Sequence, residues 1–377
     1  MSEITKSEEI DDEISAEPLI THPSEAASAA GLSYVEEGQP GFTRRRRGRG
    51  FSYYDPTGRA VADPELRVRF DRLVIPPAWS TVWICPDPFG HIQTTGRDAK
   101  GRKQYLYHPE WDVLRNQAKF GRMLAFGEGL PLLRMCIEQD LHRQKLDRDK
   151  VVALVVSLME ETLIRVGNPE YARQNRSYGL TTMLDEHVSV SGQRVNFAFT
   201  GKSGKQHSIM LQDRRLARLV QRCQELPGQR LFQYLDEDGR CCQVITSSDV
   251  NDYLRTITGQ EFSAKDFRTW GGTVLTAAHL DAAGPPENEK SANKQIVQVV
   301  KTAAVALGNT PATCRKYYIH PLVFDSYLSG GLFPAMQAGR QPPESDLQAA
   351  LSPEERGVLN LLRTTDDQPA ENTLPPI

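Results

Sequence analysis

Four side chains spread over residues 165–318 have the chemistry needed to attack a phosphodiester without a metal ion: Arg165, Lys202, Arg268 and Tyr318. Such a reaction needs a nucleophile, cations that hold the charge of a pentavalent phosphorane, and an acid that protonates the leaving oxygen. A tyrosine hydroxyl can act as the nucleophile, and a planar guanidinium holds two phosphate oxygens without deprotonating. A lysine on a mobile loop suits the acid role because neighbouring cations lower its pKa.

Taken singly, each of these residues also fits a structural role: a capping arginine, a solvated hairpin lysine, a surface ion pair or a core tyrosine. Familiar active-site signatures are missing from the sequence, which has no Walker loop, no G-x-G-x-x-G, no G-x-S-x-G and no H-E-x-x-H. No close pair of acids suits two-metal phosphoryl transfer. Chemistry on a nucleic acid would therefore rely on side chains alone.

The distribution of charge along the chain predicts a polyanionic partner. The formal net charge is only −3, but residues 1–40 carry ten acidic residues and one lysine, and residues 336–377 carry seven acidic residues and three arginines. Residues 41–335 then hold 41 basic and 31 acidic residues, or +10. Ribosomal, tRNA-binding and DNA-binding proteins share this pattern. A mildly basic surface without a partner remains an alternative on charge alone.

Composition indicates a soluble, intracellular protein of about two domains. The chain has 377 residues and 42.2 kDa, and its 39% hydrophobic content is enough for a core. We find no apolar run of about 18 residues, and the N-terminus is acidic where a secretory signal would be basic and then apolar. The six cysteines form no C-x-x-C pair, which argues against a zinc site or a disulfide framework.

The local patterns predict an α+β protein. We expect residues 1–40 to be a disordered acidic tail and residues 44–50 (RRRRGRG) to be a basic arm that does not pack. Short β-prone pieces fill residues 51–111, and three further strands over 187–190, 194–199 and 206–211 predict a three-stranded meander. Helices are expected over 151–166, with a C-cap at Gly167-Asn168, around Leu216–Cys223, over 249–256, 264–280 and 292–307, and from Pro311 onward. Residues after 336 are expected to form a loose tail, with a possible short helix near 357–363.

Four motifs in a fixed order place the candidate residues in a known context. They are IRVGNPEYARQNRSYGLTTM, FTGKSGK, KDFRTWGGT and GNTPATCRKYY, and they are preceded by IPPAW and GRDAKGRKQYLYHPEW. Together they closely resemble the type IB DNA topoisomerases in their poxvirus and bacterial form. The resemblance covers roughly residues 41–330. It implies a two-domain clamp around DNA, with a small β-rich domain at 41–115, a mainly helical catalytic domain at 116–335, and tails at 1–40 and 336–377.

The resemblance also implies a role for each residue. Tyr318 matches the nucleophile that forms a 3′-phosphotyrosine, Arg165 and Arg268 match the pair that clamps the scissile phosphate, and Lys202 matches the general acid to the 5′ oxygen. Asn309 stands where the family has a histidine that donates to a non-bridging phosphate oxygen. An amide still donates a hydrogen bond, but it is neutral and transfers no proton.

Further expectations follow from the same resemblance. DNA contacts are expected at Gln104, Tyr105, Tyr171 and Lys265. The implied activity is relaxation of supercoiled DNA by single-strand cleavage, swivelling and religation. Neither ATP nor an obligatory metal is expected, although Mg²⁺ is a candidate stimulant of turnover. We expect a monomer that binds double-stranded DNA and binds neither a nucleotide nor a membrane. Its expected location is the cytoplasm, in association with the nucleoid.

Two alternatives remain open. Tyrosine recombinases share the arginine, lysine, arginine and tyrosine set, but their second arginine usually lies in H-x-x-R, whereas this chain has Lys265 three residues before Arg268. The β-rich N-terminal segment is also unlike a helical core-binding domain. The second alternative is a DNA-binding clamp that has lost its chemistry, for which Asn309 is the one supporting feature.

Overall fold

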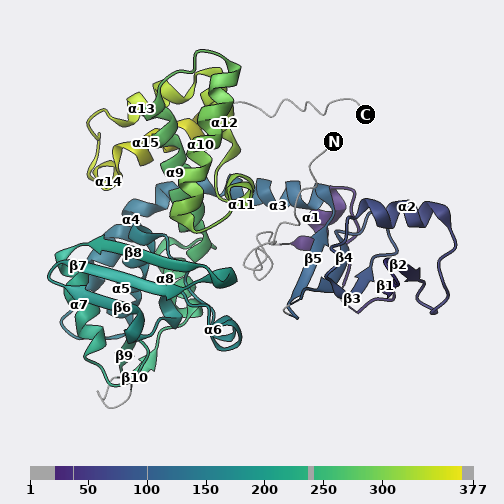
Figure 1. Ribbon diagram of the computed structural model, residues 1–377. Coiled ribbons are helices and arrows are strands. Elements are labelled where there is room, and N and C mark those ends of the chain that lie inside the picture. The colour runs from purple at the N-terminus through teal and green to yellow at the C-terminus, as the bar shows by residue number, and fades with distance from the viewer. Residues whose placement is uncertain (1–21, 37, 100, 237–241, 367–377) are drawn as a thin grey trace. The chain divides into compact units, whose positions relative to one another are not determined.

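The computed structural model describes residues 22–36, 38–99, 101–236 and 242–366. The chain divides into two compact units, Met1–Arg122 and Met123–Ile377 (Figure 1). The first unit is built on an antiparallel five-stranded sheet, and the second is mainly helical with a separate three-stranded sheet. The predicted α+β class is therefore confirmed.

The N-terminal unit packs a helix against one face of its sheet. The strands lie in the order β2-β1-β3-β4-β5, and Phe70 of the helix α2 is buried against Val82 and Ile84 of β3. Asp63 caps α2 by accepting a hydrogen bond from the backbone N–H of Glu65, which satisfies one of the free donors at the start of a helix. The elements are α1 (Pro23–Ala29), β1 (Phe42–Arg47), β2 (Gly50–Tyr54), α2 (Pro64–Arg72), β3 (Ser80–Ile84), β4 (Ile92–Arg97), β5 (Lys103–Tyr107) and α3 (Pro109–Gly121).

The arginine-rich segment is ordered, so the prediction of an unpacked basic arm was wrong. Residues 42–54 form the β1–β2 hairpin, in which Arg46 pairs with Phe51. Arg44 is 8% exposed and donates hydrogen bonds to the carbonyl oxygens of Ile75, Pro76 and Trp79. A buried guanidinium is stable there because its donors find these acceptors. The three arginines that follow it on β1, Arg45, Arg46 and Arg47, are exposed.

Part of the predicted N-terminal tail is also packed. Ala27 of α1 and Leu32 lie in a cluster with Trp111 of α3, and the backbone N–H of Val35 donates to His91 Nδ1 at 2.9 Å. Burial of these apolar groups explains why residues 22–36 belong to the fold despite their acidic context. Residues 1–21 of the predicted tail lie outside the described residues. The packing of Trp111 also keeps α3 within the first unit, whose boundary is Arg122 rather than residue 115.

The C-terminal unit contains most of the helices and the predicted meander. In the order β6-β7-β8 the strands pair antiparallel, and Val195, Phe197 and Phe199 of β7 point into the core. The elements are α4 (Met123–Leu141), α5 (Arg148–Thr162), α6 (Pro169–Asn175), η2 (Leu180–Thr182), η3 (Asp185–His187), β6 (Val188–Ser191), β7 (Arg194–Thr200), η4 (Lys202–Gly204), β8 (Gln206–Gln212), α7 (Arg214–Gln224), β9 (Gln233–Leu235), β10 (Cys242–Val244), α8 (Ser247–Thr258), α9 (Ala264–Ala283), α10 (Glu289–Leu307), α11 (Pro311–Tyr317), α12 (Pro321–Ser329), α13 (Leu332–Gly339), α14 (Asp346–Ala349) and α15 (Pro353–Asp366).

The apolar helix before Arg165 ends earlier than predicted. α5 stops at Thr162, and Leu163 adopts a left-handed conformation with φ of 54° whose N–H bonds to the Met159 carbonyl. The predicted cap at Gly167-Asn168 was therefore wrong. Asn168 instead caps α6 by accepting hydrogen bonds at its side chain. The left-handed conformation is unfavourable for a leucine by itself, so contacts with other parts of the fold must stabilise the end of α5 at Thr162.

The C-terminal segment is helical and packed, which corrects the prediction of a loose tail from 336 onward. Val358, Leu359, Leu361 and Leu362 of α15 are at most 4% exposed. α13 and α15 cross so closely that a Cβ at Gly339 would overlap the backbone at Gly357. Proline, glutamine and acidic residues between the helices obscure this amphipathic pattern in the sequence. Residues 367–377 lie outside the described residues.

Candidate active site

Arg268 lies on α9 and is held by two backbone carbonyls. α9 begins with a capping box between Ser263 and Asp266. The guanidinium is 3% exposed, donates from Nη1 to the carbonyl of Leu163, and donates from Nη2 to the carbonyl of Leu307 at 2.7 Å. The left-handed turn at Leu163 thus presents an acceptor to Arg268. These two bonds fix the plane of the guanidinium before any substrate binds.

Tyr318 lies directly beside that guanidinium. It follows α11, which starts with Thr310 as N-cap and Pro311 at the first helical position, as predicted. The Tyr318 side chain is 5% exposed, and its ring centroid lies 5.2 Å from the Arg268 guanidinium carbon. The guanidinium therefore lies over the face of the Tyr318 ring, a cation–π arrangement that holds the two side chains side by side.

Arg165 and Asn309 form a second pair. Arg165 lies in the loop after α5 and donates from Nη2 to Asn309 Oδ1 at 2.5 Å. Because the amide oxygen accepts this bond, the amide nitrogen must point the other way. Asn309 Nδ2 is buried, and no acceptor among the described residues lies within hydrogen-bond reach of it. The arrangement leaves one oriented donor for an anionic ligand.

Lys202 is carried to this region by the β7–β8 hairpin. It begins the short turn η4, where Ser203 adopts φ of 61°. Lys205, on the same turn, donates from Nζ to the carbonyl of Gly308 at 3.1 Å. That bond ties the hairpin to the residue immediately before Asn309, so the loops that bear Lys202 and Asn309 lie together.

His207 is a residue of this region that sequence reasoning missed. Its ring stacks on Phe199 with centroids 5.0 Å apart, and a Cβ at Gly308 would overlap it. Gly308 also has φ of 63°, so glycine is required there by both backbone and space. Burial and the charges of Arg165, Arg268 and Lys205 lower the pKa of His207. No local motif marks a histidine on a strand, so only the fold reveals this contact.

The predicted DNA-contact residues are distributed over α6, α9 and β5. Tyr171 is on α6 and Lys265 is in the first turn of α9, and both are half-buried. Gln104 and Tyr105 are on β5 of the N-terminal unit. Gln104 is 7% exposed and its amide donates to Asp98 at 3.4 Å, whereas the half-buried Tyr105 stacks on Tyr107.

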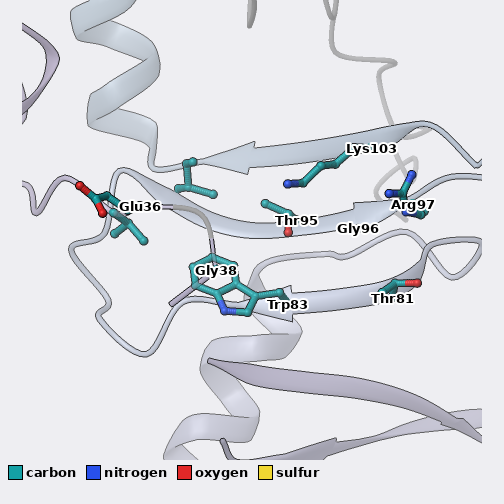
Figure 2. A pocket seen from close by; sticks show the side chains of 10 residues that line it. Glu36, Gly38, Thr81, Trp83, Thr95, Gly96, Arg97 and Lys103 are labelled. Atoms are coloured by element: carbon teal, nitrogen blue, oxygen red, sulfur yellow. The ribbon is translucent and has the colours of Figure 1, made fainter. Parts of the chain in front are cut away.

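A pocket of about 300 Å³ lies on the sheet face that carries Tyr105. In the register of β4 and β5, Thr95 pairs with Tyr105, and Arg97 pairs with Lys103, so these side chains share one face. Figure 2 shows the Lys103 ammonium and the Trp83 ring bordering the pocket, with Arg97 at its end. Cations and an indole on one face suit contact with phosphate and with a base or sugar.

The described residues hold neither a metal-ligand cluster nor a membrane-spanning helix. Within the ranges given above, no group of three or more histidine, cysteine or acidic side chains is arranged to hold a metal ion. Among the helices of those same ranges, none is both long and apolar enough to cross a membrane.

Comparison with known proteins identifies the family. The family model "Eukaryotic DNA topoisomerase I, catalytic core" matches residues 102–327, and "Bacterial DNA topoisomerase IB, N-terminal domain" matches residues 50–98. The DNA topoisomerase 1B of Acanthamoeba polyphaga mimivirus is 32% identical over 303 residues, which cover 78% of this chain and 90% of that protein. The chain belongs to the type IB DNA topoisomerases. The vaccinia virus (strain Copenhagen) DNA topoisomerase 1B is 21% identical over 237 residues, covering 61% of this chain and 70% of that protein.

The matched N-terminal domain bears on the recombinase alternative. Residues 50–98, which match the bacterial topoisomerase IB N-terminal domain, lie in the β-rich N-terminal unit. This is the segment whose sequence is unlike the helical core-binding domain of a recombinase. The five proposed catalytic positions all lie within residues 102–327, the span of the matched catalytic core.

Acidic pH should destabilise this topoisomerase through His320, close to Tyr318. Burial lowers the pKa of His320 to about 4. Its Nδ1 accepts the N–H of Leu322 at 3.1 Å, which caps α12 and requires the neutral ring. The unfolded chain, with an ordinary histidine pKa near 6.5, binds the extra proton first, so the free energy of unfolding falls as the pH drops from about 6.5 to 4.

The expected loss is about 3 kcal/mol at roughly 1.4 kcal/mol per pKa unit. Urea unfolding of the wild type and of His320→Asn, which can cap α12 without titrating, measures it. The difference in unfolding free energy between the two should shrink or reverse at acidic pH as the wild type loses stability. A constant difference from about pH 7 to pH 4 would show that His320 does not titrate as described.

Proposed function

We propose that this topoisomerase relaxes supercoiled DNA through a 3′-phosphotyrosine at Tyr318, without ATP and without an obligatory metal. The observation that carries the proposal is the convergence of the Arg268 guanidinium on the Tyr318 ring, with Arg165 bonded to Asn309 in the same unit. These groups supply a nucleophile and oriented donors for phosphate oxygens. The acid is supplied from the hairpin tied to Gly308.

In the proposed cleavage step the Tyr318 oxygen attacks the scissile phosphorus. The bond from phosphorus to the tyrosine oxygen forms while the bond to the 5′ oxygen breaks. The hydroxyl proton of Tyr318 passes to solvent water, and Lys202 gives its own proton to the leaving 5′ oxygen. Arg165 and Arg268 hold the non-bridging oxygens, and Asn309 Nδ2 donates to one of them. A single well-placed donor of this kind typically contributes about 10²–10³ in rate.

Religation is the reverse reaction. One phosphorus–oxygen bond replaces another in each direction, so the phosphodiester energy is conserved and no nucleotide hydrolysis is required. Between the two steps the free 5′ end swivels and releases torsion. We propose that the enzyme acts as a monomer on double-stranded DNA in the nucleoid, with the Tyr105 face of β5, together with Tyr171 and Lys265, contacting the duplex.

Plasmid relaxation in chelator tests the cofactor part of the proposal. Purified protein should relax a supercoiled plasmid in EDTA with no nucleotide, and added Mg²⁺ should increase turnover only by speeding product release. Multiple-turnover assays with and without EDTA measure this. Loss of all activity in chelator, not restored by lowering the salt, would contradict the metal-free mechanism.

The same assay separates the alternatives. A plasmid without paired recognition sites should be relaxed by a topoisomerase and left unchanged by a site-pairing recombinase. A clamp without chemistry would bind DNA but form no covalent adduct. Trapping the adduct with denaturant and mapping the modified peptide to Tyr318 therefore tests the nucleophile directly.

Removal of residues 1–21 should tighten DNA binding at low salt. This segment carries seven acidic residues and one lysine, tethered to a basic body. The packing of Ala27 and Leu32 makes this deletion a cleaner test than removal of residues 1–40, which would expose Trp111. If the body neutralises about 6–10 phosphates, log K should fall with log salt at a slope of about −5 to −9.

The effect of the deletion should fade as salt rises, since the Debye length shortens to about 8 Å near physiological ionic strength. Replacing the seven acidic residues by their amides is the matched control, because it removes the charge and keeps the length. Equal affinities of the full and shortened chains at about 50 mM salt would show that the segment does not compete with DNA.

A further inference from the structure

We propose that Glu355, on the C-terminal helix α15, is a positioning residue for Arg268 and acts through Trp270. The inference rests on the proposed function of Arg268 as a ligand of the scissile phosphate. It assigns a role in the reaction to a helix that begins at Pro353, beyond the residues 102–327 matched by the catalytic-core family model.

The carboxylate of Glu355 is fixed first by its own helix. The backbone N–H of Ser352 donates to Glu355 Oε2 at 2.8 Å, and the N–H of Glu355 donates to Ser352 Oγ at 3.1 Å. This reciprocal pair is a capping box at the start of α15. Glu355 is 7% exposed, so its carboxylate cannot turn to water.

Arg134 of α4 then joins Glu355 to the end of α5. Its Nη2 and Nη1 atoms donate to the two Glu355 oxygens at 2.7 and 2.9 Å, which is the bidentate geometry of a strong pair. The same guanidinium donates from Nε and Nη2 to Glu160 Oε1 at 2.9 and 2.7 Å. Glu160 lies in the last turn of α5, three residues before Leu163, whose carbonyl accepts from Arg268.

Trp270 carries the connection to α9. Its indole Nε1–H donates to Glu355 Oε1 at 3.0 Å, and the side chain is 4% exposed. Residues two apart on an α-helix point in nearly opposite directions, because each residue turns by about 100°. α9 is therefore held by Trp270 toward α15 and by Arg268 toward the carbonyls of Leu163 and Leu307.

The consequence is that one carboxylate fixes both sides of the Arg268 site. Through Trp270 it sets the rotation of α9, and through Arg134 and Glu160 it sets the end of α5 that presents the Leu163 carbonyl. A small rotation of α9 would shift the guanidinium relative to a bound phosphate. Misplacement of a catalytic group by about 1 Å can cost on the order of 100-fold in rate.

The test uses the full chain and a suicide DNA substrate cut in a single turnover. Trp270→Phe removes the indole donor and keeps an aromatic ring, and Glu355→Gln removes the charge and keeps the shape. We expect each to slow cleavage at saturating DNA by about tenfold or more. DNA affinity, measured in a Tyr318→Phe background, should stay within about twofold because binding is spread over many phosphate contacts.

A matched control removes a different tie between α15 and α4. Arg363 donates to Glu128 at 2.8 Å in an exposed ion pair, so Arg363→Ala should leave the cleavage rate unchanged. Double-mutant cycles then test whether Trp270 affects cleavage through Arg268. In an Arg268→Ala background, Trp270→Phe should have no further effect on cleavage, whereas a role in general stability would slow both backgrounds equally.

Unchanged cleavage in both Trp270→Phe and Glu355→Gln, or equal slowing with and without Arg268, would overturn the inference. Wild-type cleavage by Arg268→Ala would instead overturn the proposed function of Arg268. The two failures are therefore distinguishable.

Discussion

Replacement of Tyr318 by phenylalanine should abolish cleavage and relaxation while leaving DNA affinity nearly unchanged. The substitution removes one oxygen and no charge, and it preserves the ring that lies 5.2 Å from the Arg268 guanidinium carbon. Deleting a catalytic nucleophile typically lowers the rate by on the order of 10⁶. Single-turnover cleavage of a suicide substrate and an equilibrium binding assay measure the two quantities separately.

Tyr317→Phe is the matched control for this prediction. Tyr317 is the last residue of α11, is 7% exposed, and precedes Tyr318 directly. The Lys316 ammonium nitrogen lies 5.0 Å from the centroid of the Tyr317 ring, whereas the Tyr318 ring lies beside the Arg268 guanidinium. Tyr317→Phe should retain cleavage. Activity of Tyr318→Phe, or an adduct mapped to Tyr317, would show that the nucleophile has been assigned to the wrong residue.

Lys202→Ala should slow cleavage of ordinary DNA by about 10²–10⁴, the usual contribution of general acid catalysis. On a substrate with a 5′-bridging phosphorothiolate the leaving thiolate needs no proton, so the variant should cut it at nearly the wild-type rate. Rapid-quench cleavage of the two substrates gives the ratio. An equal defect on both would show that Lys202 contacts the phosphate and is not the acid.

Lys205 provides the comparison on the same turn. Its Nζ donates to the carbonyl of Gly308, so it holds the hairpin near Asn309 and is not proposed to transfer a proton. Lys205→Ala should slow both substrates by the same factor, because it moves the hairpin and leaves the chemistry of the leaving group unchanged. A defect confined to the ordinary substrate would move the acid role from Lys202 to Lys205.

Those parts of the fold that depend on local signals could be predicted from the sequence. Thr310 and Pro311 marked the start of α11, the alternation over residues 187–211 predicted the meander, and Ala264 was the predicted start of α9. The motifs and their order also predicted which residues make up the candidate site. Caps, turns and periodicity act within a few residues, so they can be read without the rest of the chain.

The tertiary structure decided how these residues meet. α5 ends at a left-handed Leu163 because its carbonyl accepts from Arg268, which lies more than a hundred residues away in the chain. The orientation of the Asn309 amide follows from Arg165, the stacking of His207 follows from Phe199, and the order of α15 follows from Arg134 and Trp270. Arg44 likewise lies buried because three carbonyls from another segment accept its donors. Sequence by itself determined which groups could do the chemistry and which helices and strands would carry them. Burial and long-range hydrogen bonds, which overcome unfavourable local conformations and charges, determined their geometry.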